Sequence, residues 1–134
     1  MTARILLVED DTEIRMLLRE LLESEGYEVE TATDGVAAWD KLVHQPERYQ
    51  AILLDLTLPH MTGLQLIQAL QQQYVATLRS VIVLSADTIA LQQVLAMGVG
   101  HVLTRPFDLD TILALIASVT APFLAGSNHA HEHE

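Results

Sequence analysis

The sequence predicts a doubly wound α/β fold, built as a single (βα)5 domain from five pairs of a strand and a helix. The first observation is that short apolar runs alternate along the chain with longer segments whose apolar residues recur at helical spacing. The second is that 134 residues, of which 50% are hydrophobic, suffice for one domain with one substantial core. Because crossovers between parallel strands are right-handed, helices should cover both faces of a parallel sheet.

The first pair shows the pattern clearly. Residues 5–8 are a continuous apolar run, and apolar residues then recur at helical spacing from Ile14 to Leu22, ahead of a stop at Gly26. The five strands are predicted at residues 5–8, 27–32, 51–55, 81–84 and 102–104. The five helices are predicted at about residues 14–22, 35–43, 64–73, 89–97 and 109–121.

The regular pattern ends in the last helix. Pro122 should end that helix, so we expect a domain over residues 1–121 and a polar tail over residues 122–134 that is disordered or an appended affinity tag. The tail carries three alternating histidines, which as an alternative can chelate a transition metal: His129, His131 and His133.

Composition argues against several classes of function. The formal net charge is -11, with 7 basic and 18 acidic residues, so the chain itself is not expected to bind nucleic acid. There is no cysteine, which agrees with a reducing cytoplasm. The N-terminal residues lack the long apolar stretch of a signal peptide or a membrane span. We therefore expect a cytoplasmic module without a membrane partner.

Acidic residues follow two of the predicted buried strands. Asp55 ends one apolar run, and Glu9, Asp10 and Asp11 follow another. The C-terminal ends of parallel strands meet at one edge of a sheet, so these carboxylates should converge. Converging carboxylates repel one another unless a divalent cation that prefers oxygen ligands lies among them. The sequence therefore predicts a magnesium site, although Asp10 and Glu13 also have the spacing of a capping box.

Four short strings, each at the end of a predicted strand, resemble the receiver domain of two-component response regulators. They are VEDD at 8–11, LLDLTLPHMTG at 53–63, VLSA at 83–86 and TRPF at 104–107. The resemblance covers about residues 3–121. It implies the flavodoxin-like strand order 2-1-3-4-5, which is known in CheY.

The resemblance also implies a role for each acid. Asp55 would accept a phosphoryl group, from a histidine kinase or a phosphotransfer protein, in a two-component phosphorelay. Asp10 would bind Mg²⁺, Glu9 would hold the water shell of the metal, and the backbone carbonyl of Thr57 would be a further ligand. The domain would then be a signalling phosphoacceptor that assists its own phosphorylation and dephosphorylation, not an enzyme with a separate substrate. Its downstream protein target is unknown.

Ser85 and Arg105 match the positions that sense phosphorylation in this family. Ser85 would donate a hydrogen bond to a phosphoryl oxygen, while Thr57 and Asp87 match the variable positions that tune hydrolysis of the acyl phosphate. Arg105 stands where the family usually has lysine, and the only lysine of the chain is Lys41. The resemblance further implies a cis peptide bond before Pro106.

Two other functions remain as alternatives. Val102 falls where the family has an aromatic switch, and together with Arg105 it allows a degenerate receiver that binds proteins independently of phosphorylation. A flavodoxin-like nucleotide or flavin binder would need a loop after the first strand that donates hydrogen bonds to phosphate. Glu9 and the two aspartates after it would repel that phosphate, so this reading ranks last.

Overall fold

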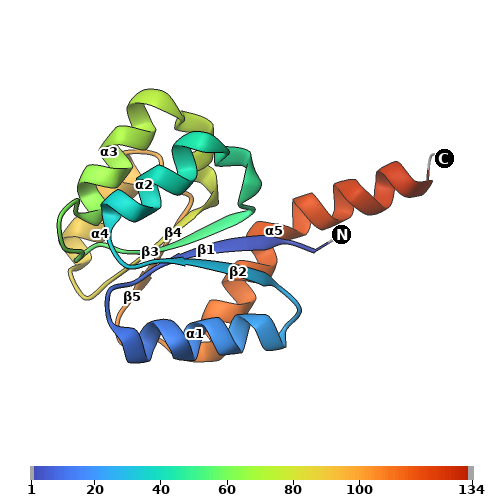
Figure 1. The fold of residues 1–134 in the computed structure, drawn as a ribbon, viewed down its shortest axis with the longest axis horizontal. Coiled ribbons are helices and arrows are strands. Elements are labelled where there is room, and N and C mark those ends of the chain that lie inside the picture. Colours follow the sequence, from blue (N-terminus) through green and yellow to red (C-terminus); the bar gives the residue numbers. More distant parts are fainter. Residues whose placement is uncertain (1, 133–134) are drawn as a thin grey trace.

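The computed structural model describes residues 2–132, with side chains up to residue 125, and contains one five-stranded parallel sheet (Figure 1). The strands are β1 (Arg4–Val8), β2 (Glu28–Ala32), β3 (Ala51–Asp55), β4 (Val81–Ser85) and β5 (His101–Thr104). They lie in the order β2-β1-β3-β4-β5, and every pairing is parallel. The predicted fold class and strand order are confirmed.

The three central strands are apolar because both of their faces are covered. All but one residue of β1 are buried, as are the first four residues of β3 and all five of β4. The edge strands differ, since β2 alternates valine with glutamate and β5 is only half-buried. A parallel sheet covered by helices selects this pattern of continuous apolar runs in its central strands.

Helices cover the two faces of the sheet unequally (Figure 1). The helices are α1 (Thr12–Ser24), α2 (Gly35–His44), α3 (Gly63–Gln73), α4 (Thr88–Ala96) and α5 (Leu109–Glu132). Helices α1 and α5 lie on one face, and α2, α3 and α4 lie on the other. Successive residues of a strand point to opposite faces, so Leu6 packs in one apolar cluster while Ile5 and Leu7 pack in the other.

Two short 3-10 helices were not predicted from the sequence. They are η1 (Pro46–Arg48) and η2 (Val75–Ser80), which lie before β3 and β4. Neither has the length or the apolar periodicity that identifies an amphipathic helix. Leu78 of η2 is nevertheless buried, so this turn adds to the core beside α3.

The prediction that the last helix ends at residue 121 is wrong. Helix α5 continues to Glu132 with Pro122 inside it, and its distal part projects away from the sheet (Figure 1). Proline removes one backbone N–H from the helix, but its fixed φ is a helical value. Phe123 and Leu124, which follow Pro122, are half-buried, so this part of the helix still contacts other residues.

The tail prediction falls largely outside the described part of the chain. Side chains from residue 126 onwards are not described, and His133 lies outside the described residues altogether. The assignment of the tail as a tag or a metal chelator therefore stays a prediction. Within residues 2–132, none of the helices combines the length and the hydropathy that crossing a membrane requires.

Candidate functional site

The site lies at the C-terminal edge of the sheet, where β1 and β3 are neighbours. Val8 is in register with Leu54, so the chain delivers Glu9 and Asp55 to the same edge. One carboxylate oxygen from each of Glu9, Asp10 and Asp55 can be chosen so that all three lie within 4.8 Å of one another. The convergence of acids that the sequence predicts is therefore present.

Glu9 is buried, with its side chain only 3% exposed. Its Oε1 atom accepts a hydrogen bond of 2.9 Å from Nη2 of Arg105, and its Oε2 atom accepts a longer one, of 3.4 Å, from the amide of Asp11. The pKa of Glu9 rises from 4.5 to about 7, mainly because of burial; the hydrogen bond from Arg105 opposes this rise and the nearby Asp55 adds to it. A carboxylate in this position favours a cation beside it.

Asp10 remains free to bind a ligand because its neighbour caps the helix. Asp11, not Asp10, is the N-cap of α1, and its Oδ1 atom accepts a hydrogen bond of 3.0 Å from the amide of Ile14. The alternative in which Asp10 and Glu13 form a capping box is therefore wrong. The side chain of Asp10 is exposed and belongs to the acid cluster.

The two carboxylate oxygens of Asp55 have different surroundings. Oδ1 accepts a hydrogen bond of 3.1 Å from the amide of Thr57, two residues further along the chain. Oδ2 lies 3.7 Å from Nη2 of Arg105. The hydrogen bond from Thr57 holds the side chain in one orientation. At 13% exposure the carboxylate can still be reached from solvent.

A small pocket of about 220 Å³ opens directly onto Asp55. It is lined by Asp55, Thr57, Ser85, Ala86 and Arg105. Ser85 is buried, and its Oγ atom accepts a hydrogen bond of 3.0 Å from the amide of Asp87, the N-cap of α4. The predicted catalytic and metal-binding residues therefore all line this pocket or belong to the adjoining acid cluster. Asp11 and Asp87 instead cap α1 and α4.

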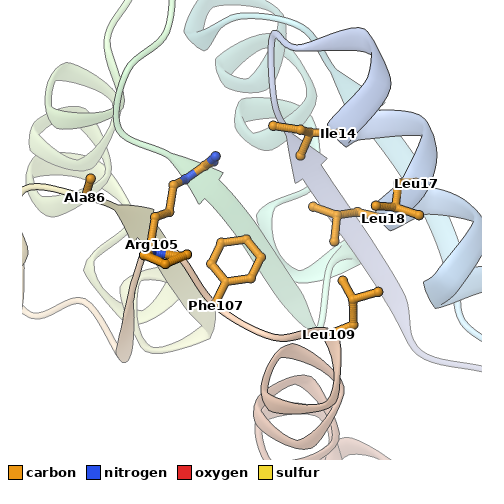
Figure 2. Close-up of a pocket in the computed structure, with 8 residues that line it drawn as sticks. Ile14, Leu17, Leu18, Ala86, Arg105, Phe107 and Leu109 are labelled. Carbon is orange, nitrogen blue, oxygen red and sulfur yellow. The ribbon is translucent and has the colours of Figure 1, made fainter.

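A second hollow adjoins this pocket (Figure 2). It is an apolar groove of about 490 Å³ between α1 and the segment that joins β5 to α5, and it shares Ala86 and Arg105 with the small pocket. Its walls are otherwise Ile14, Leu17, Leu18, Pro106, Phe107 and Leu109. Although it is larger, this groove has no acid in its lining, so the polar chemistry lies in the small pocket.

Sequence reasoning missed several residues that support the site. Arg15 of α1 donates hydrogen bonds from Nη1 to the carbonyl oxygens of Glu9 and Asp10, at 2.9 and 3.2 Å. This arginine fixes the loop that carries the two acids. Arg15 lies five residues after Asp10 in a helix. Its partners are backbone carbonyl oxygens, so no sequence motif marks the contact until the path of the loop is known.

His60 was assigned no chemistry, yet it contacts another loop at the edge of the sheet. Its Nδ1 atom lies 2.9 Å from Oδ2 of Asp34, and its backbone has a φ of 65°. Asp34 is the N-cap of α2, so the contact joins the loop after β3 to the start of that helix. The partners are 26 positions apart in the sequence, which hides the pair from any local motif.

The peptide bond between Arg105 and Pro106 is cis, as predicted. Val102 is half-buried and packs against the core cluster on the side of α2, α3 and α4. Position 102 therefore holds a small packed side chain without a ring.

The donor set fits a hard divalent cation. Carboxylate oxygens from three side chains meet at one point, and the described residues show no histidine in the cluster. Oxygen ligands of this kind select Mg²⁺ or Ca²⁺ over the metals that prefer nitrogen or sulfur. The residues Glu9, Asp10 and Asp55 could thus hold a metal ion.

Fold and site together define a class of protein. A doubly wound parallel domain carries acids at the ends of β1 and β3, a serine at the end of β4, and a cation after β5. A family model described as the response regulator receiver domain matches residues 5–117. The chain belongs to this family, and it is a signalling domain of the two-component regulatory system.

Relatives and solved structures agree with this assignment. The response regulator RppA of Synechocystis sp. is 37% identical over 118 residues, which cover 87% of this chain and 50% of the relative. The chemotaxis protein CheY4 of Vibrio cholerae is 33% identical with a TM-score of 0.76, over 89% of this chain and 99% of that one. The receiver domain of the Francisella response regulator 1452 is 27% identical with a TM-score of 0.81, over 91% and 99%. The chain spans about half the length of the curated relatives it matches.

Proposed function

We propose that the domain accepts a phosphoryl group on Asp55 in a magnesium-dependent reaction, and that this changes a protein interface. The observation that carries the proposal is the meeting of Glu9, Asp10 and Asp55 within 4.8 Å, beside the cation of Arg105. The donor would be a phosphohistidine on a histidine kinase or a phosphotransfer protein, in the cytoplasm. The domain would act on a downstream protein, and not directly on nucleic acid or membrane.

In this mechanism a carboxylate oxygen of Asp55 forms a bond to phosphorus while the bond between phosphorus and the donor imidazole nitrogen breaks. The nitrogen keeps the electron pair and is then protonated, and Asp55 carries an acyl phosphate. The amide of Thr57 fixes the orientation of the attacking carboxylate through its hydrogen bond to Oδ1. Bound Mg²⁺ would neutralise charge between the carboxylates and the incoming phosphoryl oxygens.

The metal would be held by the carboxylates of Asp10 and Asp55 and by the backbone carbonyl of Thr57, with Glu9 holding its water shell. Arg105 supplies a further positive charge, since its Nη2 atom lies 3.7 Å from Asp55. Ser85 would exchange its present hydrogen bond from the amide of Asp87 for one donated to a phosphoryl oxygen. Loss of the present bond would free the amide of Asp87, the N-cap of α4, so the exchange would reach the start of that helix.

A single experiment tests the proposal. The chain is incubated with Mg²⁺ and acetyl phosphate, and intact mass is measured for one added phosphoryl group. Asp55→Asn should stay unmodified, and so should the wild type in EDTA. Wild type that stays unmodified with both this donor and a cognate kinase would overturn phosphoacceptor function.

A degenerate receiver is the second candidate, and the geometry around Arg105 favours it in one respect. The guanidinium is 2.9 Å from Glu9 but 3.7 Å from Asp55, so it pairs more closely with the supporting acid than with the acceptor. Val102 also lacks the aromatic ring that the family uses at this position as a switch that responds to phosphorylation. If this candidate is right, a partner protein should bind wild type and Asp55→Asn with equal affinity, whatever phosphodonor is present.

A further inference from the structure

Phe107 lies close to the cation of the site, Arg105. The guanidinium carbon of Arg105 lies 5.6 Å from the centroid of the Phe107 ring, which is within the range of a cation–π contact. Figure 2 shows the Arg105 side chain extending past the ring toward the ends of the central strands. The ring therefore lies beside the arginine, and the carboxylates lie at its tip.

Both ion pairs of Arg105 use the same nitrogen, Nη2, so they alone would not fix the plane of the guanidinium at this place. Its side chain is 26% exposed, and a long charged side chain loses considerable rotamer freedom when it is ordered. The bond from Nη2 to Glu9 holds one nitrogen, but it leaves the guanidinium free to turn about that bond. An aromatic ring within cation–π distance of the guanidinium, as Phe107 is, would restrict this rotation, because a guanidinium is attracted to the face of such a ring.

The Phe107 ring is itself well anchored. It is half-buried and packs against the core cluster that contains Leu18 of α1 and Ile112 of α5. Together with Ile14 and Leu109 it also forms a wall of the apolar groove. The ring is thus held by the core of the domain, so it can fix the position of a neighbouring side chain.

We propose that Phe107 is a positioning residue that fixes the Arg105 guanidinium beside Glu9 and Asp55. The inference rests on the proposed function, because the position of the arginine matters for phosphoryl transfer only if Asp55 is the acceptor. The contact with the Phe107 ring suits an arginine at position 105, where the family usually has lysine. A compact ammonium has no planar face to stack, so the ring should matter for this arginine and much less for a lysine in its place.

The placement is tested directly by NMR of the arginine side chain. The Nε–H signal of Arg105, identified by its loss in Arg105→Lys, should move in Phe107→Leu, which removes the ring current with little loss of volume. It should stay in place in Phe107→Tyr, which keeps the ring. Leu109→Ala is the matched control, since it alters the same groove without removing the ring, and it should leave the signal unchanged. A signal that does not respond to Phe107→Leu overturns the proposal.

The consequence for chemistry is tested by a double-mutant cycle with acetyl phosphate and saturating Mg²⁺. Phe107→Leu should slow phosphorylation of Asp55 about two- to fivefold, the size expected of one partly exposed cation–π contact. The same substitution in an Arg105→Lys background should have a clearly smaller effect, and Phe107→Tyr should retain the wild-type rate. Equal slowing in both backgrounds would mean that the ring acts only on folding, and would overturn the positioning role.

The two proposals fail in different ways. If no variant and no wild type is phosphorylated while the NMR signal still responds to the ring, the phosphoacceptor function is wrong and the placement of Arg105 stands. If phosphorylation proceeds and neither the signal nor the rate responds to Phe107→Leu, the function stands and the role of Phe107 is wrong.

Discussion

Glu9→Gln should stabilise the metal-free protein at neutral and alkaline pH. Glu9 is 2% exposed, and burial is the main reason that its pKa rises from 4.5 to about 7. The nearby charge of Asp55 raises the pKa as well, while the hydrogen bond from Arg105 opposes the rise. Glutamine has nearly the same shape and can still accept that hydrogen bond, but it carries no charge.

The sign and size of the effect follow from proton linkage. Between pH 4.5 and about 7 the folded protein keeps the proton on Glu9, while the unfolded chain has lost it. The folded state therefore binds more protons in this window, and the free energy of unfolding falls as the pH rises. A gap of about 2.5 pH units at about 1.4 kcal/mol per unit corresponds to about 3 kcal/mol. The advantage of Glu9→Gln over wild type should grow by up to this amount between pH 4.5 and pH 8.

The assay is urea denaturation in EDTA at a series of pH values, with the difference in unfolding free energy between variant and wild type as the readout. Titrating groups that do not interact with Glu9 are common to both proteins and cancel in that difference. Glu13→Gln is the matched control, because it removes an exposed acid from the start of α1. A difference for Glu9→Gln that does not change with pH, or that turns against the variant at pH 8, would refute the reasoning.

Three further predictions concern the acid cluster, the start of α2 and the edge strand β2. Asp10→Asn should lower Mg²⁺ affinity in calorimetry by at least about tenfold, while Asp11→Asn, which keeps the helix cap, should change it little; equal losses would contradict the assignment. Gly35→Ala should destabilise the fold by about 1–3 kcal/mol, since its new Cβ would overlap the carbonyl oxygen of Met61, and an unchanged thermal midpoint would disprove this. At Glu30, hydrogen bonds from a tyrosine and an arginine outweigh burial and lower the pKa, so its contribution is present above pH 4.5 and lost as the pH falls through the lowered value. Glu30→Gln should therefore cost about 1–2 kcal/mol at pH 7 and less at pH 3 in urea denaturation, and a loss independent of pH would count against it.

Much of the fold could be predicted because buried parallel strands leave a direct record in the sequence. The runs that became β1, β3 and β4 are continuous and apolar, and the residues after them had to meet at one edge. The convergence of Glu9, Asp10 and Asp55 follows from that topology alone. The strand order came from the family resemblance, since alternation of strands and helices does not specify it.

The errors have physical causes. The end of α5 was misplaced because proline weakens a helix without always ending it, and Pro122 stands inside this one. The helix cap was assigned to Asp10 in one alternative, although Asp11 provides it, because adjacent acids satisfy nearly the same spacing rule. A difference of one residue here decides which carboxylate stays free.

Contacts between distant segments were beyond local patterns. Arg105 and Glu9 are 96 residues apart, and their ion pair exists only because β5 and β1 end at the same edge of the sheet. The cation–π contact between Arg105 and Phe107 depends in the same way on the path of the chain after β5. Sequence reasoning could name the residue that replaces lysine, but not the acid or the ring that holds it.

Mapping the modified residue tests the central claim most directly. Protein treated with acetyl phosphate and Mg²⁺ is reduced with borohydride, which converts an acyl phosphate on aspartate to homoserine, and the peptides are then sequenced by mass spectrometry. The account predicts homoserine at position 55 alone, and none after treatment in EDTA. Conversion at Asp10, Asp11 or another acid, or conversion at Asp55 that does not depend on the metal, would contradict it.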